Sequence, residues 1–156
     1  MKKILIVFSL LLLIGCKSKK TAVAEPKKAN FEKISFAEIN DLQKDKAYDL
    51  GKRVLMTCNT SKFKPFNTTE ATASVIQNTT EERLTKTCTR FRQYYGTFKD
   101  LELVEVYKNN YDKTTIFRYK AMYSKKVANK ELRVSMNVKN KVSAIKSLDW
   151  VDSFSK

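Results

Sequence analysis

Residues 101–150 read LELVEVYKNNYDKTTIFRYKAMYSKKVANKELRVSMNVKNKVSAIKSLDW, and this stretch decides the fold. Apolar and polar side chains alternate along most of it, which is typical of β-strands with one buried face. The pattern predicts four strands separated by turns, at residues 101–107, 114–123, 131–138 and 142–150. Strands of this kind form an antiparallel sheet, which we expect to be covered on one side only.

The two faces of this predicted sheet differ in character. The apolar face of the third strand consists of four side chains: Leu132, Val134, Met136 and Val138. Glu131 and Arg133 fall on the opposite face, and so does Arg118 in the preceding strand. We expect this polar face to be in contact with water.

A long helix is predicted ahead of the sheet, over residues 35–58. It begins at Ser35, which forms a capping box with Glu38, and apolar residues then recur at helical spacing. Gly51 lies inside this helix, where a glycine indicates either a break or a close packing contact.

A second helix is predicted over residues 79–95, with a shorter one around 70–76. Thr79 and Glu82 form the capping box of the second helix, and Gly96 lies where a left-handed C-cap residue belongs. Its apolar stripe consists of four residues: Leu84, Cys88, Phe91 and Tyr95. Helices followed by a four-stranded meander are typical of the α+β class, with the helices packed on the sheet.

The N-terminal residues, MKKILIVFSLLLLIGC, have the positive start and apolar run of a secretory signal peptide. The apolar run is too short to span a hydrocarbon core about 30 Å thick. The run Leu13-Ile14-Gly15-Cys16 resembles the bacterial lipobox, whose cysteine is diacylated and becomes the mature N-terminus. We therefore expect a signal peptide at 1–15 and a lipid on Cys16. The alternative is an ordinary signal peptide, or a short anchor, with a coincidental cysteine.

Residues 16–30 are predicted to form a flexible, Lys-rich tether, and residues 31–156 a single α+β domain. The tether contains Lys, Ala, Ser and Pro but no large apolar residue, so it cannot bury enough surface to fold. Lys17 follows the lipidated cysteine, where the usual inner-membrane retention signal has Asp. This difference from the retention signal favours the outer membrane, with the domain in the periplasm or at the cell surface.

Cys58 and Cys88 remain once Cys16 is assigned to lipid. An even number of cysteines in an oxidising compartment favours a disulfide between them. The alternative is two buried thiols that act as small apolar residues.

The chain is strongly basic, with 31 Lys and Arg against 16 Asp and Glu and a formal net charge of +15. Such a charge suits nucleic acid, anionic lipid or an acidic partner. Export to the envelope and the lack of a nucleic-acid-binding motif argue against nucleic acid. The basic residues are spread along the chain, which is typical of a generally solvated surface. The remaining candidate partners are the membrane itself, an envelope protein, anionic lipid and cell-wall polymer.

The run from Thr79-Thr80-Glu81-Glu82-Arg83-Leu84 to Tyr95-Gly96-Thr97-Phe98-Lys99, followed by four strands and Trp150, resembles a family of small secreted bacterial domains of unknown function. The resemblance covers residues 41–150. It implies a cystatin-like, ketosteroid-isomerase-like or nuclear-transport-factor-like cone, in which helices lie in the concave face of a curved sheet. It implies no particular activity, because one fold hosts many functions.

The sequence offers little for catalysis. It contains no histidine, which is the usual general base and metal ligand near neutral pH, and no phosphate-binding loop. An isomerase of this cone would need a carboxylate base and hydroxyl donors. The conceivable counterparts are four residues: Tyr107, Tyr119, Tyr123 and Asp149. We expect no catalytic, metal or cofactor site and a non-catalytic envelope module. The alternative is an isomerase-like or hydrolase-like enzyme with a pocket in the cone.

The Cys16→Ala substitution tests the predicted lipid anchor. Without the thiol no diacylglyceryl group can be attached, so the protein is expected to leave the membrane fraction. Cell fractionation with immunoblotting measures this, and a substituted protein that stays with the membrane contradicts the prediction.

Overall fold

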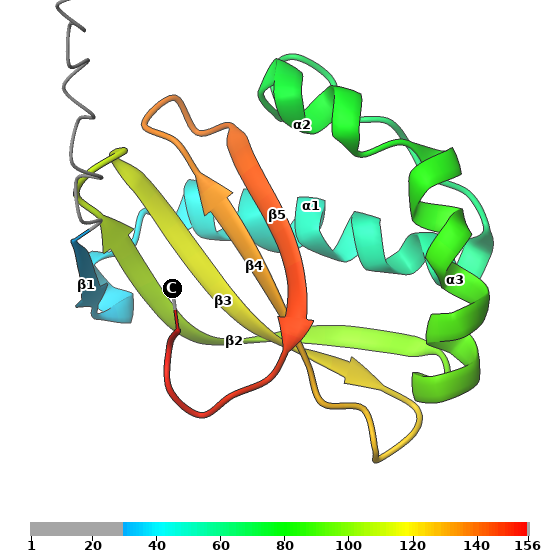
Figure 1. Ribbon diagram of the computed structural model, residues 1–156. Coiled ribbons are helices and arrows are strands. Elements are labelled where there is room, and N and C mark those ends of the chain that lie inside the picture. Colours follow the sequence, from blue (N-terminus) through cyan, green and yellow to red (C-terminus); the bar gives the residue numbers. More distant parts are fainter. Residues whose placement is uncertain (1–29, 156) are drawn as a thin grey trace, which may run out of the picture.

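The computed structural model describes residues 30–155, so the predicted signal peptide, Cys16 and the tether up to residue 29 lie outside the described residues. Three α-helices, a short 3-10 helix and five strands make up the described part (Figure 1). The helices are α1 (Asp41–Thr60), α2 (Ala73–Asn78) and α3 (Glu81–Tyr95), and the 3-10 helix is Phe36–Glu38. The strands are β1 (Phe31–Ile34), β2 (Phe98–Asn109), β3 (Thr114–Tyr123), β4 (Lys130–Met136) and β5 (Val142–Asp149).

The five strands form one antiparallel sheet in the order β1-β2-β3-β4-β5. This confirms the α+β class and the meander of the last four strands. The structure adds β1, which pairs from Phe31 opposite Asn109 to Ile34 opposite Val106. With only four residues, FEKI, this strand is too short to give a clear alternating pattern.

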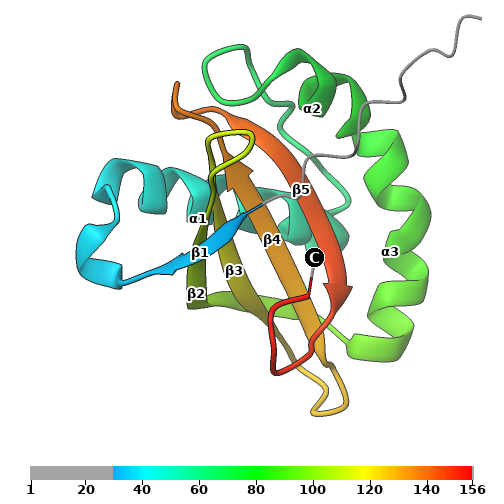
Figure 2. The ribbon, with the colours of Figure 1, turned by 60° about the vertical axis from the view of Figure 1, so that its left-hand side comes forward.

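Helix α1 crosses one face of the sheet, which we call the inner face (Figure 2). It begins at Asp41 and not at Ser35, because Ile39 is extended and the Asn40 side chain accepts the hydrogen bond from the Gln43 amide. The predicted capping box of Ser35 and Glu38 does form, but it starts the separate 3-10 helix.

Gly51 marks a close contact between α1 and the sheet, and the helix runs through it without a break. A Cβ atom built on Gly51 would lie 2.9 Å from Leu132 Cδ2 and 3.0 Å from Val134 Cγ2. A larger residue would therefore push α1 away from β4. Around this contact the core joins buried residues of the helix and the sheet: Ala47, Leu50, Val54, Phe117, Tyr119, Leu132 and Val134.

The middle of the opposite, outer face of the sheet is covered, so the prediction of a sheet covered on one side only is wrong there, whereas Met122 and Lys146 on the same face are exposed. Arg118 and Glu131 have no exposed surface, and Arg133 is 8 % exposed. Residues 150–155 continue past β5 and turn back over this face (Figure 1, red). Val138, predicted on the apolar face, lies beyond the end of β4 and is 76 % exposed.

A disulfide joins Cys58 in the last part of α1 to Cys88 in the middle of α3, with the two Cα atoms 4.8 Å apart. The predicted pairing is therefore confirmed. The bond holds together two helices that the chain separates by a long loop containing α2.

Replacing both Cys58 and Cys88 by alanine is expected to lower the free energy of unfolding by about 3–4 kcal/mol, because the 30-residue separation gives the disulfide a large effect on the entropy of the unfolded chain. Urea unfolding of the wild type and the double variant measures the difference. Wild type in reductant serves as the control, and a difference below about 1 kcal/mol would contradict the expected role.

Candidate ligand cavity

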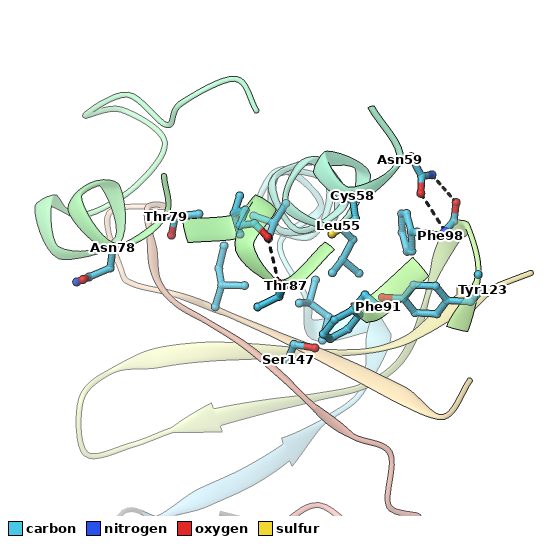
Figure 3. Close-up of a pocket in the computed structure, with 15 residues that line it drawn as sticks. Leu55, Cys58, Asn59, Asn78, Thr79, Thr87, Phe91, Phe98, Tyr123 and Ser147 are labelled. Atoms are coloured by element: carbon cyan, nitrogen blue, oxygen red, sulfur yellow. Dashed lines mark hydrogen bonds between the residues drawn. The ribbon is translucent and has the colours of Figure 1, made fainter. Parts of the chain in front are cut away.

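A cavity of about 230 Å3 lies between α1, α3 and the inner face of the sheet (Figure 3). Val54 of α1 and Leu132 of β4 contribute apolar surface to it. Leu84 and Phe91 line it from α3, and Ile145 lines it from the edge strand β5.

The wall formed by α3 explains why the cavity exists. The apolar stripe predicted for this helix is present, yet Cys88 is the only residue of α3 that is buried. Cys88 is bonded to α1, whereas Leu84 and Phe91 on the same stripe face the cavity. The stripe therefore forms a cavity wall in addition to a helix–helix contact.

One end of the cavity is closed by a side chain that pairs with a strand backbone. The Asn59 side chain donates to the Phe98 carbonyl at 2.7 Å and accepts from the Phe98 amide at 3.1 Å (Figure 3). This pairing ties the end of α1 to the start of β2. Next to it, Gly96 has φ of 79°, and a Cβ atom there would lie 2.1 Å from Ser124 Oγ. Glycine is therefore required where α3 turns into β2.

Aromatic rings gather at the same end. The Tyr123 ring lies 5.6 Å from the Phe98 ring and 5.8 Å from the Tyr95 ring, measured between centroids. Burial raises the pKa of the Tyr123 hydroxyl to about 12, with a smaller contribution from Tyr95. The phenol is therefore neutral throughout the physiological pH range.

None of the 15 residues that line the cavity carries a formal charge. The polar groups that they offer are hydroxyls and amides: Asn59, Asn78, Thr79, Thr87, Tyr123 and Ser147. Within residues 30–155, no three side chains of His, Cys, Asp or Glu lie close enough together to hold a metal ion. This lining provides apolar contact and neutral hydrogen bonds, and no ion pairing.

The four conceivable catalytic residues are not brought together. Tyr107 lies on the outer face, stacked on Phe154 with 4.1 Å between ring centroids. Tyr119 packs under α1, and its hydroxyl lies 3.5 Å from the Lys44 carbonyl. The Asp149 side chain is 79 % exposed and pairs with Lys130 at 2.5 Å, so only Tyr123 reaches the cavity.

Most of the cavity residues could not be identified from the sequence. Asn59 belongs to α1 and Ile145 and Ser147 to β5, far apart in the chain, and no motif links them. The one available signal is the stripe on α3, which predicts an inward-facing surface but does not predict that a space is left beneath it.

Comparisons with known proteins return no match, either to a family model or to a curated protein or solved structure. Within the described chain, every helix is too short or too polar to cross a membrane.

Tyr123 is expected to ionise near pH 12 instead of pH 10.0, the pKa of an unperturbed tyrosine. Because folding raises this pKa, its contribution to stability is complete below pH 10.0 and is lost as the pH rises toward 12. The difference in ultraviolet absorbance between wild type and Tyr123→Phe, titrated from pH 8 to 12.5 with circular dichroism to confirm folding, measures the step. A step centred near pH 10 in the folded protein would contradict the burial of this hydroxyl.

Proposed function

We propose that this chain is a lipid-anchored lipoprotein of the cell envelope, and that its domain is a non-catalytic module that binds a small uncharged, largely apolar molecule. The cavity that lacks any charged lining residue is the observation that carries the binding part of the proposal. In a chain in which 30 % of residues are charged, such a lining excludes ionic ligands, because an ion would lose its hydration without gaining a counter-charge.

The anchoring part of the proposal rests on the sequence. The lipobox-like run ends at Cys16, and residues 17–29 could span at most about 45 Å between the lipid and the folded part. The outer membrane is the proposed location because Lys17 stands where an inner-membrane retention signal has Asp. An envelope protein, anionic lipid or cell-wall polymer is a possible further partner of the basic surface.

We also propose that the fold is the cystatin-like cone. Two features support it: α1 lies across the inner face, and β2 has two register irregularities, between Phe98 and Asp100 and between Leu103 and Glu105. Irregularities of this kind bend a strand and so help to curve a sheet around a helix. The cavity then lies at the wide side of the cone, between β5 and α3.

The size of the cavity limits the ligand. Its volume of about 230 Å3 is below the 300–1,000 Å3 that is typical of sites for drug-sized molecules. A small ring system or part of an acyl chain fits this space, with a neutral polar group directed toward Tyr123. High affinity is not expected from so small a contact area.

The alternative, an isomerase-like or hydrolase-like enzyme, requires a carboxylate that faces the ligand. The fully buried carboxylate of Glu131 lies on the outer face, in ion pairs with Arg118 and Arg133. Asp149 is directed to solvent. The position of these two carboxylates favours binding over catalysis.

Binding of the neutral fluorescent probe N-phenyl-1-naphthylamine tests the proposal. The probe is expected to bind to the chain from residue 17 onward, which carries no lipid, with fluorescence enhancement that saturates at one site. The Leu84→Glu variant is expected to bind at least tenfold more weakly, because the new carboxylate lies in the apolar wall.

Leu42→Glu is the matched control, because Leu42 is 76 % exposed on α1 and lies outside the cavity. It makes the same chemical change and is expected to leave binding unaltered. Equal loss in both variants, or no saturable binding by the folded wild type, would refute a ligand site in this cavity.

A further inference from the structure

A groove of about 300 Å3 lies on the surface beside the second half of α3, next to the cavity. Residues three and four apart share one side of a helix. Five residues of α3 line the groove in this way: Thr87, Arg90, Phe91, Tyr94 and Tyr95. Lys130, the first residue of β4, also lines it. Thr87 and Phe91 line the cavity as well, whereas Arg90 and Tyr94 do not, so the groove has a chemistry of its own.

Lys130 holds two of the aromatic rings of the groove in place. Its ammonium nitrogen lies 5.0 Å from the centre of the Tyr95 ring and 5.5 Å from the centre of the Phe91 ring. Lys130 also pairs with Asp149 at 2.5 Å. Burial alone would lower the pKa of Lys130, but hydrogen bonds with Asp149 and Tyr95 raise it, so the ammonium group stays charged. The rings are therefore positioned by a cation whose charge is already balanced within the protein.

Arg90 is the cation that the groove leaves for a ligand. Within residues 30–155 its guanidinium group has no carboxylate partner, and its contact is with the Tyr94 ring, 5.9 Å from the ring centre. This distance is at the outer limit of a cation–π interaction. A guanidinium group presents its donors in a planar fork that matches the two oxygens of a carboxylate. The donors of Arg90 are therefore available for an acidic group.

Tyr94 presents an aromatic surface beside this arginine. Its side chain is 56 % exposed, and its ring lies 6.3 Å from the Tyr95 ring between centroids. An aromatic ring supplies a flat apolar surface, and the tyrosine hydroxyl adds a polar group at its edge. A sugar ring has a matching shape, because one of its faces consists of C–H groups and its edge is polar. A carboxylate on that edge would reach Arg90 when the C–H face lies on Tyr94.

A second arginine without a carboxylate partner lies on the same side of α3. Arg83 precedes Arg90 by seven residues, which corresponds to about 10 Å along a helix. Its side chain donates to the Asn78 side chain at 2.6 Å and, in the part of the chain that the structure describes, pairs with no carboxylate. A polymer that leaves the groove along α3 would thus meet two guanidinium groups. This spacing suits a chain with repeated acidic groups better than a single small anion.

We propose that the groove beside α3 binds an acidic polysaccharide, with a sugar ring against Tyr94 and its carboxylate on Arg90. The proposal rests on the proposed location in the cell envelope and specifies which polymer the basic surface meets, but it does not use the cavity. A phospholipid headgroup is a weaker candidate, because it brings no ring face for Tyr94. An acidic peptide is also weaker, because its backbone amides need acceptors and the lining side chains offer only hydroxyl oxygens.

Isothermal titration calorimetry with the trimer of α-1,4-linked galacturonic acid tests the proposal. The full-length protein is used in a polyoxyethylene detergent, which carries no sugar, and the trimer is expected to bind saturably at one site. The methyl ester of the trimer keeps the sugar rings without their charges and is expected to bind at least about tenfold more weakly. Triglutamate keeps the carboxylates without the rings and is expected to bind about fivefold more weakly. Added salt is expected to weaken binding of the trimer, because exposed charges are screened.

The variant with Arg90→Gln and Tyr94→Ala is expected to bind the trimer at least about tenfold more weakly, because the ion pair and the ring contact are both lost. Arg92→Gln with Tyr111→Ala makes the same two changes outside the groove and is expected to bind as wild type. Arg92 is likewise an exposed arginine of α3, and Tyr111 is 57 % exposed. Circular dichroism reports folding, and Arg90→Gln alone is expected to give about threefold weaker binding if the double variant does not fold.

Several results would overturn the proposal. Absence of saturable binding by the folded wild type would remove the site. Equal binding of the methyl ester would show that Arg90 recognises no charge, and equal binding of triglutamate would assign the groove to acidic peptides. Equal loss in both double variants would assign binding to the general basic charge. Neither Arg90 nor Tyr94 lines the cavity, so binding of N-phenyl-1-naphthylamine is expected to be unchanged in the groove variant, and the two proposals fail separately.

Discussion

The bond between Cys58 and Cys88 is the constraint on which the cavity depends. Most residues of helix α3 are exposed or partly exposed, and Cys88 is its only buried residue. An apolar stripe such as Leu84 and Phe91 gains free energy by collapsing onto the nearest apolar surface. The disulfide fixes α3 against the end of α1 instead, and Asn59 ties the same end to β2. The stripe is left facing a space that it lines without filling.

The two faces of the sheet differ in charge: the cavity on the inner face is uncharged, and the outer face contains buried ion pairs. On the inner face the lining is uncharged, and the Tyr123 hydroxyl is kept neutral by burial. On the outer face Glu131 is fully buried between Arg118 and Arg133. Ion pairs of this kind add little net stability, but removing one partner leaves an uncompensated buried charge. Residues 150–155 complete the arrangement by giving each arginine a carbonyl and an aromatic ring.

The sequence predicts the fold well where a repeating pattern of apolar residues continues over many positions. It predicts least where segments that are distant in the chain meet. The alternation in residues 114–123 gives β3 with its bounds unchanged, whereas the four residues of β1 give too few repeats. The start of α1 shifts from Ser35 to Asp41 because Ser35 caps a separate 3-10 helix and Asn40 caps α1, with the extended Ile39 between them. Burial of Arg118 is invisible to local patterns, since the residues that cover it come more than thirty positions later.

Strand β4 supports both the cavity and the packing of the C-terminal residues, because alternate residues of a strand point to opposite faces. Leu132 lines the cavity and lies against Gly51, whereas Arg133 lies beneath residues 150–155 and pairs with the buried Glu131. A shift in register by one residue would move a charged side chain into the uncharged cavity and an aliphatic one under the C-terminal residues. Both faces therefore disfavour the same shift, and each face stabilises the register that the other one needs. The cavity and the buried ion pairs are chemically unrelated, but they are linked through the pleat of one strand.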